Sequence, residues 1–287
     1  MVKIDPIQPG ESVVELWNRA FGGAFPLDGR LLLHNTTENP PFTLLAASDG
    51  TAVGFAVGRP GFVDALGVVP ERRRQGVGSA LLDALLDRMG PGPVRAGGGP
   101  AHFFPGIPDE FQACAAPLFE RRGFRPDWTA VDLRRPGADP PPPDPRIRPC
   151  SAPDSLLAFL EREFPGRWLR DTRRRLEREP DPSSILVSTK EGRVVAFCHT
   201  FGPWDRVLGP SVFWRVLLSY PWGGLGPVGV AADCRGEGLG LGLVHTAIHS
   251  LAARGAADIV VDWTGVPDFY EKAGFTVWQR YRSWLRP

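Results

Sequence analysis

Apolar residues recur along this chain at two different spacings, which predict a mixed architecture of strands and helices. Short apolar or alternating runs predict strands, whereas apolar residues three and four positions apart predict helices. The expected strands are 2–8, 42–47, 52–57, 62–69, 93–96, 146–149, 185–188, 194–200, 228–230, 259–262 and 277–285. The expected helices are 11–21, 27–34, 80–89, 151–164, 167–178 and one that begins at Leu241.

A glycine-rich turn joins a strand to a helix in the second half of the chain. It consists of Arg235, Gly236, Glu237, Gly238, Leu239 and Gly240. Glycines lack a Cβ atom, so the backbone can approach a ligand closely, and the N–H groups of the first helical turn face an anion. Arg235 would add a cation for the same group. The turn therefore predicts a phosphate-binding loop.

The same turn pattern occurs in the first half of the chain, at Arg73, Gly76 and Gly78. It also follows an apolar run and precedes a helix with apolar residues at helical spacing. Each turn is followed by a tail centred on aromatic residues, at 118–124 in the first half and at 269–275 in the second. Two ordered motifs that each occur twice predict an internal duplication.

At these residues the chain resembles the GNAT acetyltransferases, in both glycine turns and both aromatic tails. The resemblance implies two tandem GNAT folds of the α/β (α+β) class. Each would be a mixed, mostly antiparallel sheet flanked by helices, with a splayed central parallel strand pair. It also implies acetyl-CoA as the cofactor. The cofactor-binding residues that it implies are Val228, Val230, Arg235, Gly236, Glu237, Gly238, Leu239 and Gly240, with Arg73, Arg74, Gly76 and Gly78 in the corresponding loop of the first half.

A proline-rich stretch separates the two halves and marks the expected domain boundary. Proline-rich segments are stiff and extended, as linkers between domains often are. We therefore expect an N-terminal GNAT domain at 1–135, a linker at 136–149 and a C-terminal GNAT domain at 150–287.

The aromatic tails differ at the position where the resemblance implies a general acid. This position holds Tyr270 in the second half and Phe119 in the first. Phenylalanine has no proton to give, so we predict that the second half is catalytic and the first is degenerate. For the general base we favour Asp262, at the end of an expected strand, because partial burial among aromatic residues would raise its pKa towards a useful value.

Other acidic residues are also candidates for the role of base. Asp64 precedes the first glycine turn at the spacing of a family base, but it lies in the half without the tyrosine. The aligned position in the second half is Gly226, which has no side chain. Asp268 is interpreted as an acid at a helix N-terminus. The alternative for Asp262 itself is a cap or turn residue.

The resemblance implies acetyl transfer to the primary amine of a small molecule. An insertion in the second half holds Trp204, Trp214 and Trp222, and Trp263 and Trp278 lie near its tail. Flat aromatic surfaces beside carboxylates suit an amino sugar, although these tryptophans could instead pack the core or the seam between the halves. The chain is similar to glucosamine/glucosaminide N-acetyltransferases. The alternatives are mycothiol synthases, which acetylate a cysteinyl-amine sugar, and a non-catalytic coenzyme A sensor.

The bulk composition excludes several other classes of function. Lys and Arg number 33 against 32 Asp and Glu, so no net field would recruit nucleic acid or an anionic membrane. The N-terminus lacks an apolar signal region, and no apolar run approaches the length of a membrane span. We expect a cytoplasmic protein without nucleic-acid or membrane partners. Because the halves can pair with each other, we expect a monomer or a weak homodimer.

No metal site is expected from the cysteines and histidines. The four cysteines are scattered, and His245 and His249 lie four apart on one helix without an apparent third ligand. The arginine-rich helix at 167–178 interleaves Asp171 and Glu177 with its basic residues, so we interpret it as a solvated face rather than an anion site.

Overall fold

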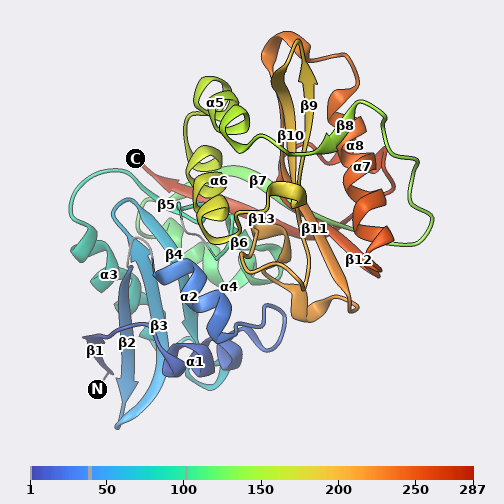
Figure 1. Cartoon of the computed structure of the whole chain (residues 1–287). Coiled ribbons are helices and arrows are strands. Elements are labelled where there is room, and N and C mark those ends of the chain that lie inside the picture. Colours follow the sequence, from blue (N-terminus) through green and yellow to red (C-terminus); the bar gives the residue numbers. More distant parts are fainter. Residues whose placement is uncertain (1, 38–40, 101–102) are drawn as a thin grey trace. The chain divides into compact units, whose positions relative to one another are not determined.

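The structure, a computed structural model, describes residues 2–37, 41–100 and 103–287, and the chain divides into two compact units. Unit 1 comprises Met1–Ala130 together with Gln279–Pro287, and unit 2 comprises Val131–Trp278. Each unit contains its own strands and helices (Figure 1).

Unit 1 follows the order of strands and helices expected for the first half. Its elements are β1 (Val2–Pro6), α1 (Glu11–Phe21), α2 (Gly29–Thr36), β2 (Phe42–Ser48), β3 (Thr51–Arg59), β4 (Phe62–Val68), α3 (Val77–Met89), β5 (Val94–Ala96), β6 (Ile107–Pro108), α4 (Asp109–Glu120), the start of β7 (Arg125–Pro136) and the end of β13 (Thr276–Arg286). Neighbouring strands in the order β1-β2-β3-β4-β5-β13 form its sheet. All of these pairs are antiparallel except β4 with β5.

The parallel pair of unit 1 is short. Phe62 pairs with Arg95 and Val63 with Ala96, and β4 continues beyond the end of β5. The core beneath this sheet is aromatic: the Trp17 ring is fully buried, stacks on Phe104 at 5.3 Å and donates its ring N–H to a backbone carbonyl. Burial of such large rings supplies a major share of the apolar area removed from water.

Unit 2 repeats this plan with its own elements. They are the end of β7, β8 (Ile147–Pro149), α5 (Pro153–Glu163), α6 (Arg167–Arg178), β9 (Ile185–Lys190), β10 (Arg193–Phe201), β11 (Trp222–Val230), α7 (Leu239–Ala253), β12 (Asp258–Thr264), α8 (Pro267–Glu271) and the start of β13. The sheet order is β7-β12-β11-β10-β9-β8, with β11 and β12 as its parallel pair. Helices α5 and α6 lie on one face of this sheet and α7 on the other (Figure 1). Two mixed, mostly antiparallel sheets with one parallel pair each confirm the predicted fold class.

The ends of the two units differ from the expected domain limits. Residues 279–287 were expected in the second domain, yet they belong to unit 1, where Trp284 of β13 pairs with Ala96 of β5. Conversely, the end of β7 belongs to unit 2, where it pairs with β12. The physical reason is strand pairing: each of these segments completes the sheet that offers it a hydrogen-bonding edge.

The proline-rich stretch between the halves lies on unit 2. Gly137 donates its N–H to the carbonyl of Ala257 at 2.8 Å, and Asp144 donates its N–H to the Thr246 hydroxyl at 2.9 Å. A Cβ atom built on Gly242 of α7 would clash with the Asp144 carboxylate, so only glycine leaves room for this close approach. The residues expected to form a linker therefore pack closely on α7.

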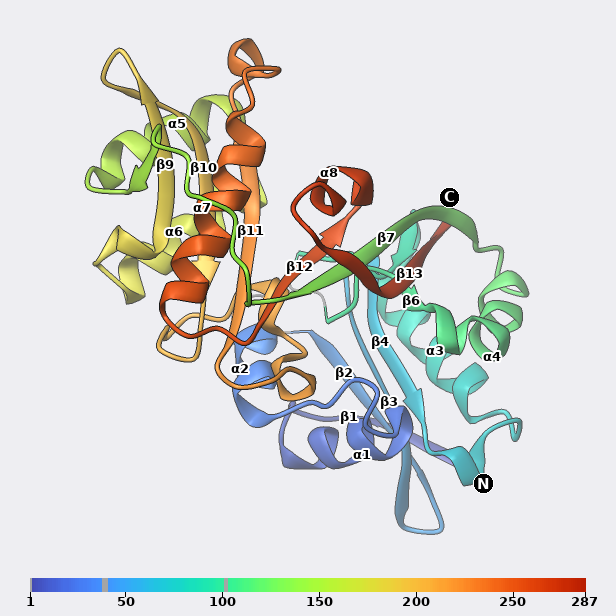
Figure 2. The ribbon, with the colours of Figure 1, turned by 90° about the vertical axis from the view of Figure 1, so that its right-hand side faces the viewer.

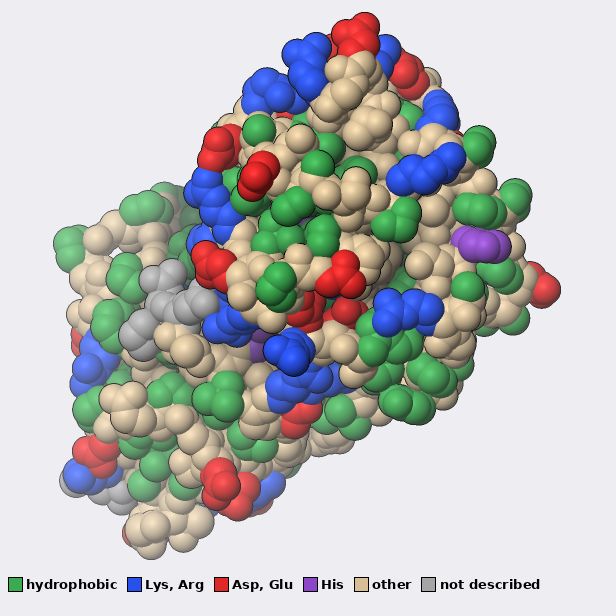
Figure 3. Space-filling view, in the orientation of Figure 1, with side chains coloured by type: hydrophobic (Ala, Val, Ile, Leu, Met, Phe, Trp, Pro, Cys, Tyr) green, Lys and Arg blue, Asp and Glu red, His purple; other side chains and the backbone are tan. Residues whose placement is uncertain are grey.

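Charged side chains of both signs appear on the face shown in Figure 3, as the nearly balanced composition predicts. Within the residues that the structure describes, no helix has both the length and the apolar character needed to cross a membrane.

Candidate active site

Tyr270 and Asp262 are brought together by two consecutive elements of unit 2. Asp262 lies near the end of β12, and Tyr270 is buried in the short helix α8. Burial raises the pKa of the Tyr270 hydroxyl, and the negative charge of the nearby Asp262 carboxylate raises it further. The phenol therefore keeps its proton at neutral pH, within electrostatic reach of the Asp262 carboxyl.

The parallel strand pair opens beside Asp262. Strands β11 and β12 pair only from Trp222 to Leu225, and Figure 2 shows them diverging beyond that point. The next residue, Gly226, has φ +121°, a conformation that favours glycine. A Cβ atom built on Gly226 would lie 3.9 Å from Oδ1 of Asp262. The absence of a side chain at this position leaves space in front of the carboxyl.

The surroundings of Asp262 shift its pKa to a value that suits proton transfer. Burial raises its pKa to about 7, the charge of Asp132 raises it as well, and Arg167 opposes both effects. The side chain nevertheless stays half-buried rather than sealed from solvent. A carboxyl that changes protonation near neutral pH can accept a proton from a bound ammonium group.

Asp132 is a site residue that the sequence pattern did not reveal. It lies on β7, a strand absent from the expected elements, and only 4% of its surface is exposed. Its carboxylate accepts the backbone N–H of Trp263, with an N–O distance of 2.8 Å. The available signal was the apolar run around the acid, in which Val131 and Leu133 flank Asp132.

The second glycine turn has the geometry of an anion cradle. Gly236 and Gly238 have φ +86° and +78°, and a Cβ atom on Gly236 would meet nothing within 4 Å. Helix α7 begins at Leu239, and no side chain caps its first turn. The predicted start at Leu241 was therefore two residues late, because the left-handed Gly238 is itself the N-cap. An exposed loop with open space over Gly236 fits a phosphate group.

The other residues predicted to bind the cofactor flank this cradle. Arg235, Gly236, Glu237 and Gly238 are exposed, whereas Leu239 is buried beneath the loop and Gly240 is half-buried. The Glu237 carboxylate pairs with Lys190 at 3.3 Å, and its backbone carbonyl accepts a hydrogen bond from Arg146 at 2.9 Å. Val228 and Val230 lie on the part of β11 that no longer pairs with β12.

Unit 1 has a formed cleft at the corresponding place. Its volume is about 430 Å³, and the predicted loop residues that line it are Arg73, Arg74, Gly76 and Gly78. Arg73 is held in place by backbone carbonyls, because its guanidinium donates to Val68 at 3.1 Å and to Ala20 at 2.5 Å. The first loop therefore retains the shape of a ligand site.

The chemistry of the unit 1 cleft differs from that of unit 2. Phe119, which also lines the cleft, has no hydroxyl. Asp64 forms a buried ion pair with Arg59. Burial raises the pKa of Asp64 to about 7, although the arginine acts in the opposite direction. Unit 1 thus has a cleft and a buried carboxyl, but its aromatic tail contains no tyrosine.

The tryptophans of the insertion are mostly covered. Trp214 and Trp222 are buried, and the guanidinium of Arg254 lies 3.9 Å from the centre of the Trp204 ring. Trp263 is covered in the same way by Arg167, at 4.3 Å. The alternative of core packing therefore holds for Trp214 and Trp222.

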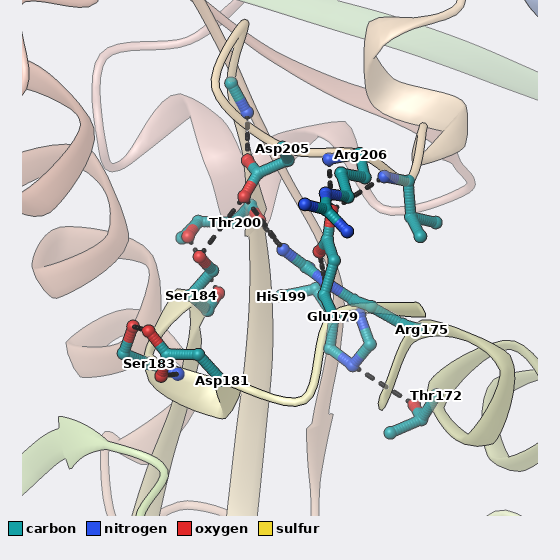
Figure 4. Close-up of polar contacts among 12 residues, drawn as sticks. Thr172, Arg175, Glu179, Asp181, Ser183, Ser184, His199, Thr200, Asp205 and Arg206 are labelled. Atoms are coloured by element: carbon teal, nitrogen blue, oxygen red, sulfur yellow. Dashed lines mark hydrogen bonds and ion pairs between the residues drawn. The ribbon is translucent and has the colours of Figure 1, made fainter. Parts of the chain in front are cut away.

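A buried polar cluster joins α6 to the end of β10 (Figure 4). Arg175 is 2% exposed; it donates from Nε to Glu179 at 3.2 Å and from Nη2 to the carbonyl of Thr200 at 2.9 Å. Its Nη2 also lies 3.5 Å from the Asp205 carboxylate. The prediction of a solvated face for this helix was wrong at Arg175, because the face that carries it turns towards the sheet.

The same cluster fixes the segment that follows β10. Glu179 accepts the backbone N–H groups of Arg206 and Val207, and Asp205 accepts that of Gly202 at 2.6 Å. His199 meets the Thr172 hydroxyl at 3.1 Å, and burial together with the charge of Arg175 holds the pKa of His199 well below its ordinary value. The cluster therefore anchors the start of the tryptophan-rich insertion.

Arg175→Met is expected to destabilise the protein by about 3–5 kcal/mol, because it leaves two buried carboxylates without their counter-charge. The matched control is Arg173→Met on the same helix, where an exposed ion pair with Glu161 is worth at most about 1 kcal/mol. Urea unfolding followed by circular dichroism measures both changes. Equal losses of stability in the two variants would contradict the structural role assigned to the cluster.

Comparison with known proteins gives the family. The model of the Acetyltransferase (GNAT) family matches residues 10–91 and 154–275. A mycothiol acetyltransferase from Clavibacter michiganensis subsp. michiganensis is 30% identical over 285 residues, which cover 92% of this chain and 87% of the relative. The mycothiol acetyltransferase of Thermomonospora curvata is 28% identical over 284 residues, covering 88% of this chain and 85% of the relative.

Two solved structures extend the comparison. A GCN5-related glucosamine N-acetyltransferase region of a fungal multi-domain GH3 beta-N-acetylglucosaminidase is 27% identical, with a TM-score of 0.88 over 99% of this chain and 38% of that chain. A tandem GNAT protein from the clavulanic acid biosynthesis pathway shares the fold at 16% identity and a TM-score of 0.65, over 99% of this chain and 98% of that chain. With one family match in each half of its sequence, the chain belongs to the acetyltransferase (GNAT) family and is an N-acetyltransferase.

Proposed function

We propose that unit 2 transfers the acetyl group of acetyl-CoA to the primary amine of a small molecule, by direct attack of the amine on the thioester. The observation that carries this proposal is the convergence of Asp262 and Tyr270 where β11 and β12 stop pairing. One group has a pKa of about 7 and the other is a buried neutral phenol. Such a pair supplies the base and the acid that amide formation needs.

The glycine turn and the free part of β11 would hold the coenzyme. The exposed N–H groups of the turn and the positive end of α7 would bind its phosphates. Beyond Leu225, β11 no longer pairs with β12, so the backbone at Val228 and Val230 can pair with the amide groups of the pantetheine arm. When bound, the coenzyme supplies an activated thioester carbonyl.

The two side chains move the protons of the reaction. Asp262 accepts a proton from the ammonium group, which frees the nitrogen lone pair to form the new C–N bond. Tyr270 donates its proton to sulfur as the C–S bond breaks and the electron pair stays on sulfur. The newly bonded nitrogen loses its second proton, which restores the Tyr270 hydroxyl. The products are an amide and a thiol, and Asp262 then releases its proton to solvent.

For unit 1 we propose coenzyme binding without transfer. The cleft of about 430 Å³ and its loop support binding. Phe119 cannot protonate a leaving thiolate, and the Asp64 carboxyl is engaged by Arg59. Its role would then be structural or regulatory, as in the sensor alternative, but confined to one half of the chain.

For the acceptor we propose an amine on an amino sugar or on a cysteinyl derivative of one. Two carboxylates, Asp262 and Asp132, lie close together in unit 2 and favour a cationic acceptor. The relatives named mycothiol acetyltransferase, and the fungal region described as a glucosamine N-acetyltransferase, support this class of acceptor.

Thiol release from acetyl-CoA in the presence of different amines tests this proposal. The panel comprises glucosamine, chitosan oligomers, cysteinyl amino sugars, polyamines and peptides with a free N-terminus. We expect turnover on the amino sugars or their cysteinyl derivatives, and little on peptides. Turnover on peptides or polyamines alone would overturn the proposed acceptor. Coenzyme binding without thiol release on any amine would favour the sensor.

A further inference from the structure

The end of β12 departs from regular strand geometry where it presents Asp262. On β7, Leu133 and Val131 are two residues apart, but their partners on β12, Val261 and Thr264, are three apart. One extra residue therefore lies on β12 between these pairs, which defines a β-bulge. Bulges beside active sites commonly redirect a side chain.

The bulge contains a backbone conformation that a bulky residue rarely adopts. Trp263 has φ +44°, in the left-handed region, at a cost of about 1–3 kcal/mol that the surroundings must offset. Two described contacts hold this residue: Asp132 accepts its N–H at 2.8 Å, and Arg167 covers its ring at 4.3 Å. The hydrogen bond to Asp132 acts directly on the strained peptide unit.

The Asp132 carboxylate also affects the protonation of Asp262. The charged groups that act on Asp262 are Asp132 on β7 and Arg167 on α6, and Asp262 in turn acts on Tyr270 of α8. Of these, Asp132 carries the like charge, and Arg167 opposes it. Asp132 therefore favours the state in which Asp262 holds a proton or faces a cation.

We propose that Asp132 is a positioning residue for the transfer site, which fixes the β12 bulge through the Trp263 N–H and places a like charge near Asp262. This inference rests on the proposed role of Asp262 as the base. It assigns a function to a buried acid on a strand that neither glycine turn nor aromatic tail includes.

Two substitutions separate the two effects of Asp132. Asp132→Asn keeps an oxygen that can accept the Trp263 N–H but removes the charge, whereas Asp132→Leu removes both. The matched control is Asp258→Asn at the other end of β12, where the carboxylate pairs with Arg134 of β7 at 2.6 Å. This control removes a carboxylate charge between the same two strands without touching the bulge.

The primary readout does not depend on turnover. A carboxyl-carbon NMR titration of labelled aspartates follows Asp262, with Asp262→Asn assigning its signal. We expect the midpoint to fall by about one pH unit in Asp132→Asn and to stay unchanged in Asp258→Asn. An unchanged midpoint in Asp132→Asn would overturn the electrostatic part of the proposal.

Kinetics on the best amine give the second readout. In Asp132→Asn the acidic limb of the kcat/KM profile should move to lower pH with the NMR midpoint, while kcat at high pH changes little. In Asp132→Leu we expect kcat to fall about 10- to 100-fold, because a displaced Asp262 no longer meets the amine. Wild-type kcat in folded Asp132→Leu would overturn the positioning role. A shifted NMR midpoint in a protein that turns over no amine would contradict the proposed function and not the role of Asp132.

Discussion

Replacing Tyr270 with Phe is expected to lower kcat for acetyl transfer about 100- to 10,000-fold, with little change in the affinity for acetyl-CoA. The substitution removes only the hydroxyl from a buried ring, so the packing of α8 against the core is preserved. What is lost is the proton that the leaving sulfur must receive. Initial rates of thiol release and calorimetric titration with coenzyme A measure the two quantities.

Tyr281→Phe is the matched control for this prediction. Tyr281 is a buried tyrosine in the part of β13 that belongs to unit 1, so the same chemical change is made outside the proposed site. We expect its kcat to remain within about twofold of the wild type. If both variants lose activity equally, or if Tyr270→Phe keeps full activity, Tyr270 is not the general acid.

Asp262→Asn is expected to lower kcat/KM about 100- to 1,000-fold, because an amide cannot accept the ammonium proton. In the wild type, the rate should rise with pH and level off above pH 7, as Asp262 loses its proton. A pH–rate profile from pH 5 to 9 measures both effects. An Asn variant that retains the wild-type profile would exclude Asp262 as the base.

The same substitution should reveal how strongly the fold disfavours the charged carboxylate. The pKa of Asp262 is raised in the folded protein from its ordinary value of 3.8, so the folded state binds the proton more tightly than the unfolded chain. Its contribution to stability is complete below about pH 4 and is lost as the pH rises through about 7. Asp262→Asn should therefore be more stabilising at pH 8 than at pH 5 in urea unfolding. An identical difference at both values would contradict the raised pKa.

The two units share the glycine turn but differ in the residues to which we assign the chemistry. Both contain a glycine turn with left-handed residues, at Gly76 in unit 1 and Gly238 in unit 2. The aromatic tails differ by a single hydroxyl at Phe119 and Tyr270. The two units also differ in the strand that carries the carboxyl. In unit 1 it is Asp64 on the first strand of the parallel pair, and in unit 2 it is Asp262 on the second. We therefore propose that binding and catalysis depend on different residues of the repeat.

Much of this fold followed from local patterns in the sequence. The hairpins β2/β3 and β9/β10 and the glycine turns each depend on residues within about ten positions, so alternation and turn chemistry suffice to predict them. Tyr270 was predicted because the duplicated tail exposed a difference between two otherwise similar segments, and Asp262 because it ends an expected strand close to that tail.

The remaining features depend on partners far away in the sequence. Strand β7 mixes apolar residues with Arg134 and Arg135, and its role is set by pairing with β12, more than a hundred residues later. Asp132 became a site residue only through that pairing. The sequence pattern predicted Arg175 to be one of several solvated arginines, but in the structure it pairs with Glu179 and Asp205. Local periodicity carries no information about such contacts.

The most direct measurement of the central claim follows the acetyl group itself. Acetyl-CoA labelled in the acetyl carbons is incubated with the protein and the best amine, and the product is identified by mass spectrometry. We predict labelled amide with the wild type, and none with Gly238→Val, which forces a β-branched residue into the left-handed N-cap of α7 in the anion cradle of unit 2. Labelled amide formed equally by Gly238→Val, or no labelled amide from any amine while coenzyme A binds, would contradict acetyl transfer by unit 2.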